Sequence, residues 1–98
     1  MSDATWRETF TIGADHPALP GHFPGRPIVP GVVLLDRVAA ALQRWRGQTI
    51  GGLPQVKFLA PLLPGETAEL HLEATPTRVR FRILRGAEPL AGGEIEPA

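Results

Sequence analysis

Two side chains in the first third of the chain could carry out acid–base chemistry. His22 lies in a loop rich in proline, and a stiff loop holds a histidine in the fixed position that a general base needs. Asp36 follows fourteen residues later in an apolar segment, where an unpaired carboxylate would be costly to bury. The acid is therefore either kept for chemistry or anchored by Arg37, Arg44 or a backbone amide, and the sequence leaves both readings open. A loop histidine can likewise be incidental.

Gly31 is a third candidate because it begins a predicted helix. Amide N–H groups in a first helical turn have no intrahelical partner and lie at the positive end of the helix dipole. Such an amide could bind a carbonyl oxygen on which charge develops. The alternative, a glycine required only for close packing, is favoured by spacing alone. A metal cluster of Asp15, His16 and His22 is improbable, since prolines intervene and the chain has no cysteine.

The helix that would position Gly31 and Asp36 is predicted from Pro30 to about Trp45. Pro30 suits the start of a helix and Gly47 suits the position just past its end. Nearly every residue in between is apolar until position 43. A helix that is apolar almost all round is expected to be buried.

The remaining segments alternate in polarity as strands do. Residues 5–12 form one strand, with Glu8 as the exception on its apolar face. Residues 49–65 form one or two strands broken at Gly51, Gly52 and Pro54, and further strands are expected at 66–74, 77–83 and roughly 90–95. The fold class is therefore α+β, one long buried helix wrapped by an antiparallel sheet of about five strands.

A hairpin about Thr75 and Pro76 predicts a register for two of these strands. It pairs Glu73 with Arg78, His71 with Arg80, and Glu69 with Arg82. The stripe of arginines at positions 78, 80, 82 and 85 is then best explained as a solvated sheet face rather than a basic binding site.

Composition limits the functional classes. The 98 residues suffice for one domain, 1–98, and the formal net charge of zero does not favour nucleic acid or membrane as partner. The N-terminus lacks the pattern of a signal peptide and no apolar stretch reaches the length of a membrane span. A cytoplasmic protein is the default expectation. A second copy would add buried surface to so short a chain.

Residues 21–36, GHFPGRPIVPGVVLLD, resemble the signature of the 3-hydroxyacyl-(acyl carrier protein) dehydratases of the hot-dog superfamily. In that family a Gly-His-Phe-Pro-Gly loop precedes Pro-Gly and a buried helix bearing Glu or Asp. The spacings of nine residues from His22 to Gly31 and fourteen to Asp36 agree with it. Residues 56–66, VKFLAPLLPGE, are similar to a second family segment. The hot-dog fold has the shape reached above from polarity alone.

The resemblance implies a reaction and roles. His22 would remove the α-proton of a 3-hydroxyacyl thioester, Asp36 would assist departure of the β-hydroxyl, and the Gly31 amide would hold the thioester carbonyl. A substrate tunnel would be lined by five further residues: Phe23, Pro30, Val32, Val33 and Ala40. No metal or other cofactor is implied, because the phosphopantetheine arm would arrive with the acyl carrier protein. An acidic surface of that carrier would meet Lys57 or the arginine-bearing face.

The resemblance also implies an assembly. In this superfamily the histidine and the acid of one site come from different subunits, so activity would require a homodimer, with a higher oligomer or a heterodimer also open. The product would be a trans-2-enoyl thioester for fatty-acid or polyene-type lipid synthesis.

The chain departs from the family pattern in three respects. It is short, it has Asp rather than the commoner Glu at position 36, and it has Ala40 where many relatives carry glutamine. Two other functions therefore stay open: a non-catalytic hot-dog subunit that binds acyl chains or an active partner, and an acyl thioesterase.

Overall fold

Alternating apolar residues build five antiparallel strands in the computed structural model, which describes residues 4–17, 19 and 28–98. The strands are β1 (Thr5–Thr11), β2 (Ile50–Phe58), β3 (Thr67–Ala74), β4 (Val79–Arg85) and β5 (Glu88–Pro97). They form one sheet in the order β1-β3-β4-β5-β2, and every neighbouring pair is antiparallel. The predicted sheet is confirmed, and its edge strands are β1 and β2.

The helix α1 (Gly31–Arg46) begins and ends where the sequence predicts. Pro30 is the N-cap residue, in an extended conformation with φ −61° and ψ 145°. Gly47 ends the helix in the left-handed region at φ 65°, and its N–H donates to the Gln43 carbonyl at 2.8 Å. Glycine adopts this conformation without steric cost, which explains why the helix stops there.

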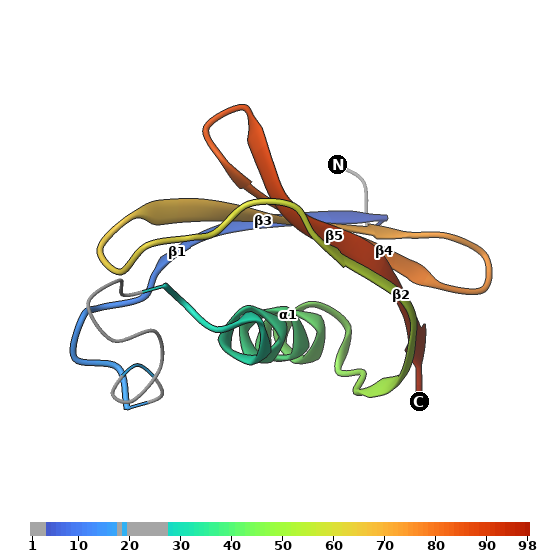
Figure 1. Cartoon of the computed structure of the whole chain (residues 1–98). Coiled ribbons are helices and arrows are strands. Elements are labelled where there is room, and N and C mark those ends of the chain that lie inside the picture. The colour runs from blue at the N-terminus through green and yellow to red at the C-terminus, as the bar shows by residue number, and fades with distance from the viewer. Residues whose placement is uncertain (1–3, 18, 20–27) are drawn as a thin grey trace.

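Helix and sheet form two layers around one core, with α1 lying against one face of the sheet (Figure 1). The helix contributes the buried side chains Val33, Leu34, Val38, Ala41 and Leu42. The sheet contributes inward-facing residues that are also fully buried, among them Leu70, Leu72, Phe81, Ile83, Leu90 and Ile95. This arrangement is that of the hot-dog fold.

The helix is covered on one side only, which differs from the expectation of a helix buried almost all round. Val32 is 63% exposed, and Asp36 and Ala40 are exposed as well. These three residues are four positions apart and so share one face. A single layer of strands covers only the opposite side of a helix, and no other described element covers this one (Figure 1). We call Val32, Asp36 and Ala40 the open strip of α1.

The β3–β4 hairpin has a register two residues away from the predicted one. His71 lies opposite Arg82 and Glu73 opposite Arg80. The turn centres on Pro76 and Thr77, because the Thr75 N–H donates to the Arg78 carbonyl at 2.8 Å and the Arg78 N–H donates to Thr75 Oγ1 at 3.0 Å. A shift of two residues keeps every side chain on its predicted face, so alternation alone could not detect it.

The predicted break at Gly51, Gly52 and Pro54 is wrong, because strand β2 runs through all three residues. Its pairing with β5 is irregular at these residues. Because β2 is an edge strand, Pro54 can lack an N–H donor without leaving a neighbouring strand unpaired. The last strand is longer than predicted and reaches from Glu88 to Pro97.

Glu8, the exception on the apolar face of β1, forms a polar contact with the helix. Its carboxylate accepts a hydrogen bond from Trp6 Nε1 at 2.8 Å and one from Arg44 Nη2 at 2.5 Å. Burial raises the pKa of Glu8, but the hydrogen bonds from Arg44 and Trp6, with the charges of Arg44 and Arg37, lower the pKa below its ordinary value. The misfit in the polarity pattern is thus a partnered carboxylate at the helix–sheet boundary.

Candidate functional site

The N-terminus of α1 faces an apolar hollow of about 390 Å³. Its lining comes from two segments, residues 28–31 with Leu34, and residues 58–62 at the end of β2. Phe58 and Leu59 are 53% and 60% exposed, so the hollow opens to the surface. An apolar recess beside uncapped amide groups is suited to an acyl chain whose carbonyl end lies at the helix terminus.

Gly31 is held in close contact with the Phe58 ring. A Cβ atom at position 31 would lie 2.7 Å from Phe58 Cζ, closer than real Cβ atoms approach other atoms. The packing explanation for this glycine therefore has direct support. Within the described residues, no side chain caps the helix terminus, and the first turn of α1 contains no acid.

An arginine that the sequence reading assigned to a solvated stripe organises the lining of the hollow. Arg85 Nη1 donates to the Pro61 carbonyl at 3.1 Å and to Glu66 Oε1 at 2.7 Å. The Leu62 carbonyl, one residue on, accepts the Val29 N–H at 2.9 Å. Arg85 thus connects β4 to the segment after β2, and that segment in turn binds Val29, just before α1. Strand periodicity does not indicate this role.

Glu66 binds both Arg85 and the backbone of the segment after β2. Its Oε1 accepts the Leu63 N–H at 2.8 Å. That backbone hydrogen bond, together with the hydrogen bond and charge of Arg85, lowers the pKa of Glu66 below its ordinary value. The carboxylate therefore stays ionised and keeps the loop after β2 in place at neutral pH.

Asp36 lies in the open strip without a partner. It forms no ion pair or side-chain hydrogen bond with any residue that the structure describes. Both arginines considered as structural anchors are engaged elsewhere: Arg44 binds Glu8, and the Arg37 guanidinium lies 5.7 Å from the centre of the Phe10 ring. The anchoring explanation thus loses its two named side chains, and the carboxylate is available to a ligand or to another chain.

The other predicted site residues divide into groups. His22 and Phe23 lie outside the described residues. Pro30 lines the hollow together with Gly31. Val32 and Ala40 flank Asp36 in the open strip, whereas Val33 is 3% exposed and belongs to the core. Of the four predicted tunnel residues that the structure describes, Pro30 alone lines the hollow.

In residues 4–17, 19 and 28–98, no three His, Asp or Glu side chains gather as a metal site would require. Within the same residues, no helix has the length and apolarity to cross a membrane.

The fold and the sequence together define the class of protein. The hot-dog architecture and the motif of residues 21–36 are those of a dehydratase-type chain, and a family model confirms it. The ApeI-like family, described as ApeI dehydratase, matches residues 1–94. The chain belongs to this family.

Named relatives and a solved structure agree with the family. A FabZ 3-hydroxyacyl-(acyl-carrier-protein) dehydratase from Haemophilus influenzae (strain PittEE) is 30% identical over 91 residues, 83% of this chain and 62% of that protein. The chain thus spans less than two thirds of that relative. A FabZ from Mannheimia succiniciproducens is 30% identical over 103 residues, 94% of this chain and 69% of that one. The dehydratase heterocomplex ApeI:P from Xenorhabdus doucetiae superposes with a TM-score of 0.88 at 25% identity, covering 99% of this chain and 89% of that chain.

A more distant structure supports the fold alone. The (R)-hydratase from A. caviae involved in PHA biosynthesis has a TM-score of 0.79 at 20% identity. It covers 97% of this chain and 94% of its own.

Proposed function

We propose that the protein is a hydro-lyase that converts a 3-hydroxyacyl thioester into the trans-2-enoyl thioester and water. The observation that carries this proposal is the unpartnered Asp36 of the open strip, in a chain of a dehydratase family, with an apolar hollow at the start of the same helix. Asp36 is five residues from Gly31, about 7.5 Å along the axis of α1. One substrate can therefore reach both.

The reaction needs a base, an acid and a carbonyl-binding group. His22, assigned by the sequence motif, accepts the α-proton. The charge that develops on the thioester oxygen is stabilised by the amide of Gly31 at the helix terminus. The bond from the β-carbon to its hydroxyl breaks as Asp36 donates a proton to the departing oxygen, directly or through a water. The α-proton and the hydroxyl are lost, the double bond forms, and proton transfer from His22 to Asp36 through solvent restores the site.

A second chain is part of the proposal. The open strip leaves Val32 and Ala40 exposed beside the acid, and an apolar surface around a reacting group works best when water is excluded. A second copy that covers the strip would provide this and would bring its own His22 to the acid, giving a homodimer with shared sites. Because the similar Xenorhabdus structure is a heterocomplex, a different hot-dog chain is the other partner to test.

The substrate would arrive on acyl carrier protein, as the names of the FabZ relatives state for those enzymes. Its phosphopantetheine arm makes a bound cofactor unnecessary in this mechanism. The reaction would serve fatty-acid or polyene-type lipid synthesis in the cytoplasm.

The test uses a 3-hydroxyacyl pantetheine thioester, so that docking of a carrier does not enter. We expect wild-type protein to generate enoyl absorbance and to hydrate the enoyl thioester in reverse. His22→Ala and Asp36→Asn should lose turnover, whereas His71→Ala and Glu73→Gln, on the opposite face of the sheet, should keep it. Release of free thiol without enoyl product would indicate a thioesterase instead.

A non-catalytic subunit is the second candidate, and Ala40 favours it. The exposed alanine provides no polar side chain to orient Asp36 from the next turn of the helix. If the wild type has no activity over several acyl lengths but binds the enoyl thioester, and a partner's activity survives His22→Ala, the subunit function replaces the dehydratase.

A further inference from the structure

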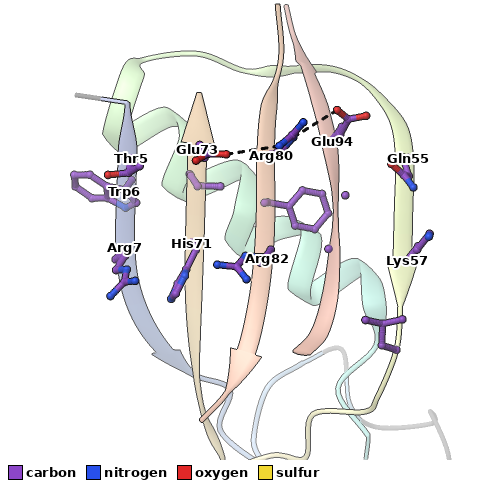
Figure 2. A pocket seen from close by; sticks show the side chains of 15 residues that line it. Thr5, Trp6, Arg7, Gln55, Lys57, His71, Glu73, Arg80, Arg82 and Glu94 are labelled. Carbon is purple, nitrogen blue, oxygen red and sulfur yellow. Dashed lines mark ion pairs between the residues drawn. The ribbon is translucent and has the colours of Figure 1, made fainter. Parts of the chain in front are cut away.

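A transverse row of the sheet is basic at four of its five positions. Arg7 on β1 lies opposite His71 on β3, which lies opposite Arg82 on β4. Gly92 on β5 follows, and Lys57 on β2 ends the row. Figure 2 shows these side chains on the sheet face turned away from α1, with Arg7, His71 and Arg82 at one level of three adjacent strands. We call Arg7, His71, Arg82 and Lys57 the basic row.

Three members of the basic row lack a partner. Arg7, Arg82 and Lys57 are exposed and form no ion pair or side-chain hydrogen bond in the described part of the chain. His71 differs, because its Nε2 lies 3.2 Å from Glu69 Oε2. Like charges placed directly opposite one another destabilise a sheet. In a chain whose formal net charge is zero, this concentration of unpaired cations requires an explanation.

The nearest acids on this face are already engaged. In the adjacent row, Arg80 lies between Glu73 and Glu94, at 3.9 Å and 4.0 Å (Figure 2). That row holds two glutamates and one arginine, and Glu94 also accepts a hydrogen bond from Arg78 Nη1 at 3.2 Å, so both of its acids already have partners. Within the described residues, the unpaired positive charge on the outer face thus lies on one line across the strands.

The basic row crosses a broad hollow of about 910 Å³ in this face. Gly92 lies in the row between Arg82 and Lys57 and contributes no side chain, so the floor of the hollow is open there. At the β2 end, Leu59 is 60% exposed and lines both this hollow and the one at the start of α1. A ligand on the row would therefore meet three unpaired cations and, at one end, an apolar side chain.

We infer that the basic row is a docking surface for an acidic amphipathic helix of a partner protein. Neighbouring strands lie about 4.8 Å apart, and carboxylates three or four residues apart on a helix are separated by about 5–6 Å. Such a helix laid across the strands would bring successive carboxylates to successive members of the row and an apolar residue to Leu59. An acyl carrier protein with such a helix is one partner of this chemistry, and that identity alone rests on the proposed function.

The flanking row argues against a polyanion. A nucleic acid strand is anionic along its whole length and would also meet Glu73 and Glu94, about 7 Å from the basic row along the strands. A helix can place acids on one stripe and neutral or basic residues on the next. A basic row beside a row that holds two glutamates and one arginine therefore fits a protein helix better.

The experiment titrates isotope-labelled full-length protein with a helix-stapled peptide that carries glutamates at three- and four-residue spacing and a terminal leucine. We expect chemical-shift changes at the basic row, Gly92 and Leu59, and affinity that weakens with salt. The same peptide with glutamine in place of glutamate should bind at least about tenfold more weakly.

Charge-reversal variants test whether the peptide binds at the basic row. Arg82→Glu and Lys57→Glu should each weaken the glutamate peptide by about tenfold, the loss of a charge pair replaced by a repulsion. Arg46→Glu is the matched control: it changes net charge equally, but its guanidinium lies 4.3 Å from the Trp45 ring, at the end of α1. Equal weakening by Arg46→Glu, equal binding of the glutamine peptide, or tighter binding of an oligonucleotide or an anionic vesicle to the same row would overturn the inference. Because the readout is binding, failure of the proposed dehydration would leave it unaffected.

Discussion

The two faces of α1 both carry apolar residues but have very different surroundings. The face toward the sheet carries Leu34, Val38 and Leu42, which are 3%, 0% and 0% exposed. The open strip carries Val32, Asp36 and Ala40, all exposed. Each face also has an acid nearby. Glu8 beside the first is held by Trp6 and Arg44, whereas Asp36 on the second has no partner in the described residues.

The difference indicates what each face is for. Apolar residues against the sheet stabilise a single chain, and the acid at that boundary is neutralised by hydrogen bonds. Apolar residues on the open strip stabilise nothing within the described chain, and the acid among them has no partner in the described residues.

The largest expected effect lies on the open strip. Asp36→Asn should lower turnover of a 3-hydroxyacyl thioester by about 10²–10⁴-fold, the range for loss of a general acid. Its free energy of unfolding should change by no more than about 0.5 kcal/mol, since the side chain is exposed and unpaired. Enoyl absorbance and urea denaturation on the same preparation measure both, and a large loss of stability would contradict the distinction between the faces.

The next-largest effect is expected for stability, on the side of α1 that faces the sheet. Leu42→Ala should lower the free energy of unfolding by about 2–5 kcal/mol, because it removes a fully buried side chain. Val32→Ala is the matched truncation on the open strip, with an expected cost below about 0.5 kcal/mol at low protein concentration. If a second chain covers the strip, the cost at Val32 should grow with protein concentration. A cost at Val32 equal to that at Leu42 at every concentration would refute one-sided burial.

A smaller effect is expected where the two faces meet at the helix N-terminus. Gly31→Ala forces a Cβ atom to within 2.7 Å of Phe58 Cζ, but the exposed ring can swing outward, so the cost should be about 1 kcal/mol. Phe58→Ala in the same chain should remove that cost. A double-mutant cycle by chemical denaturation checks the coupling, and additive costs would show that the ring does not explain the glycine.

The smallest effect concerns the acid on the sheet side. Glu8→Gln should cost about 0.5–1 kcal/mol at neutral pH, because its partner Arg44 is 51% exposed. The pKa of Glu8 lies below its ordinary value, so the stabilisation is complete above the ordinary pKa and is lost as the pH falls through the lowered one. Denaturation of both proteins over this range should show their difference vanish in acid. A difference that persists there would mean the charge of Glu8 is not its source.

Much of this architecture was readable from residue order. The period-2 pattern of residues 67–74 and 79–85 defines strands whose apolar faces meet a core. Pro30 and Gly47 mark the ends of α1. Register was not readable, because a slip of two residues preserves every face. The turn with its Thr75–Arg78 hydrogen bonds and the strand pairing that follows it set the register. The role of Arg85 was also hidden, since its acceptors Pro61 and Glu66 are distant in the chain.

The sequence by itself determined the strands, the helix and the motif that places the chain among dehydratases, because these depend on local periodicity and on residue types at fixed spacing. Only the tertiary structure decided which side of the helix is covered, which acid is paired and which cations align across five strands. Those outcomes depend on strand order and register, and hence on contacts between residues far apart along the chain. The local sequence determines only which face of its strand or helix a residue occupies, and not which distant residue it contacts.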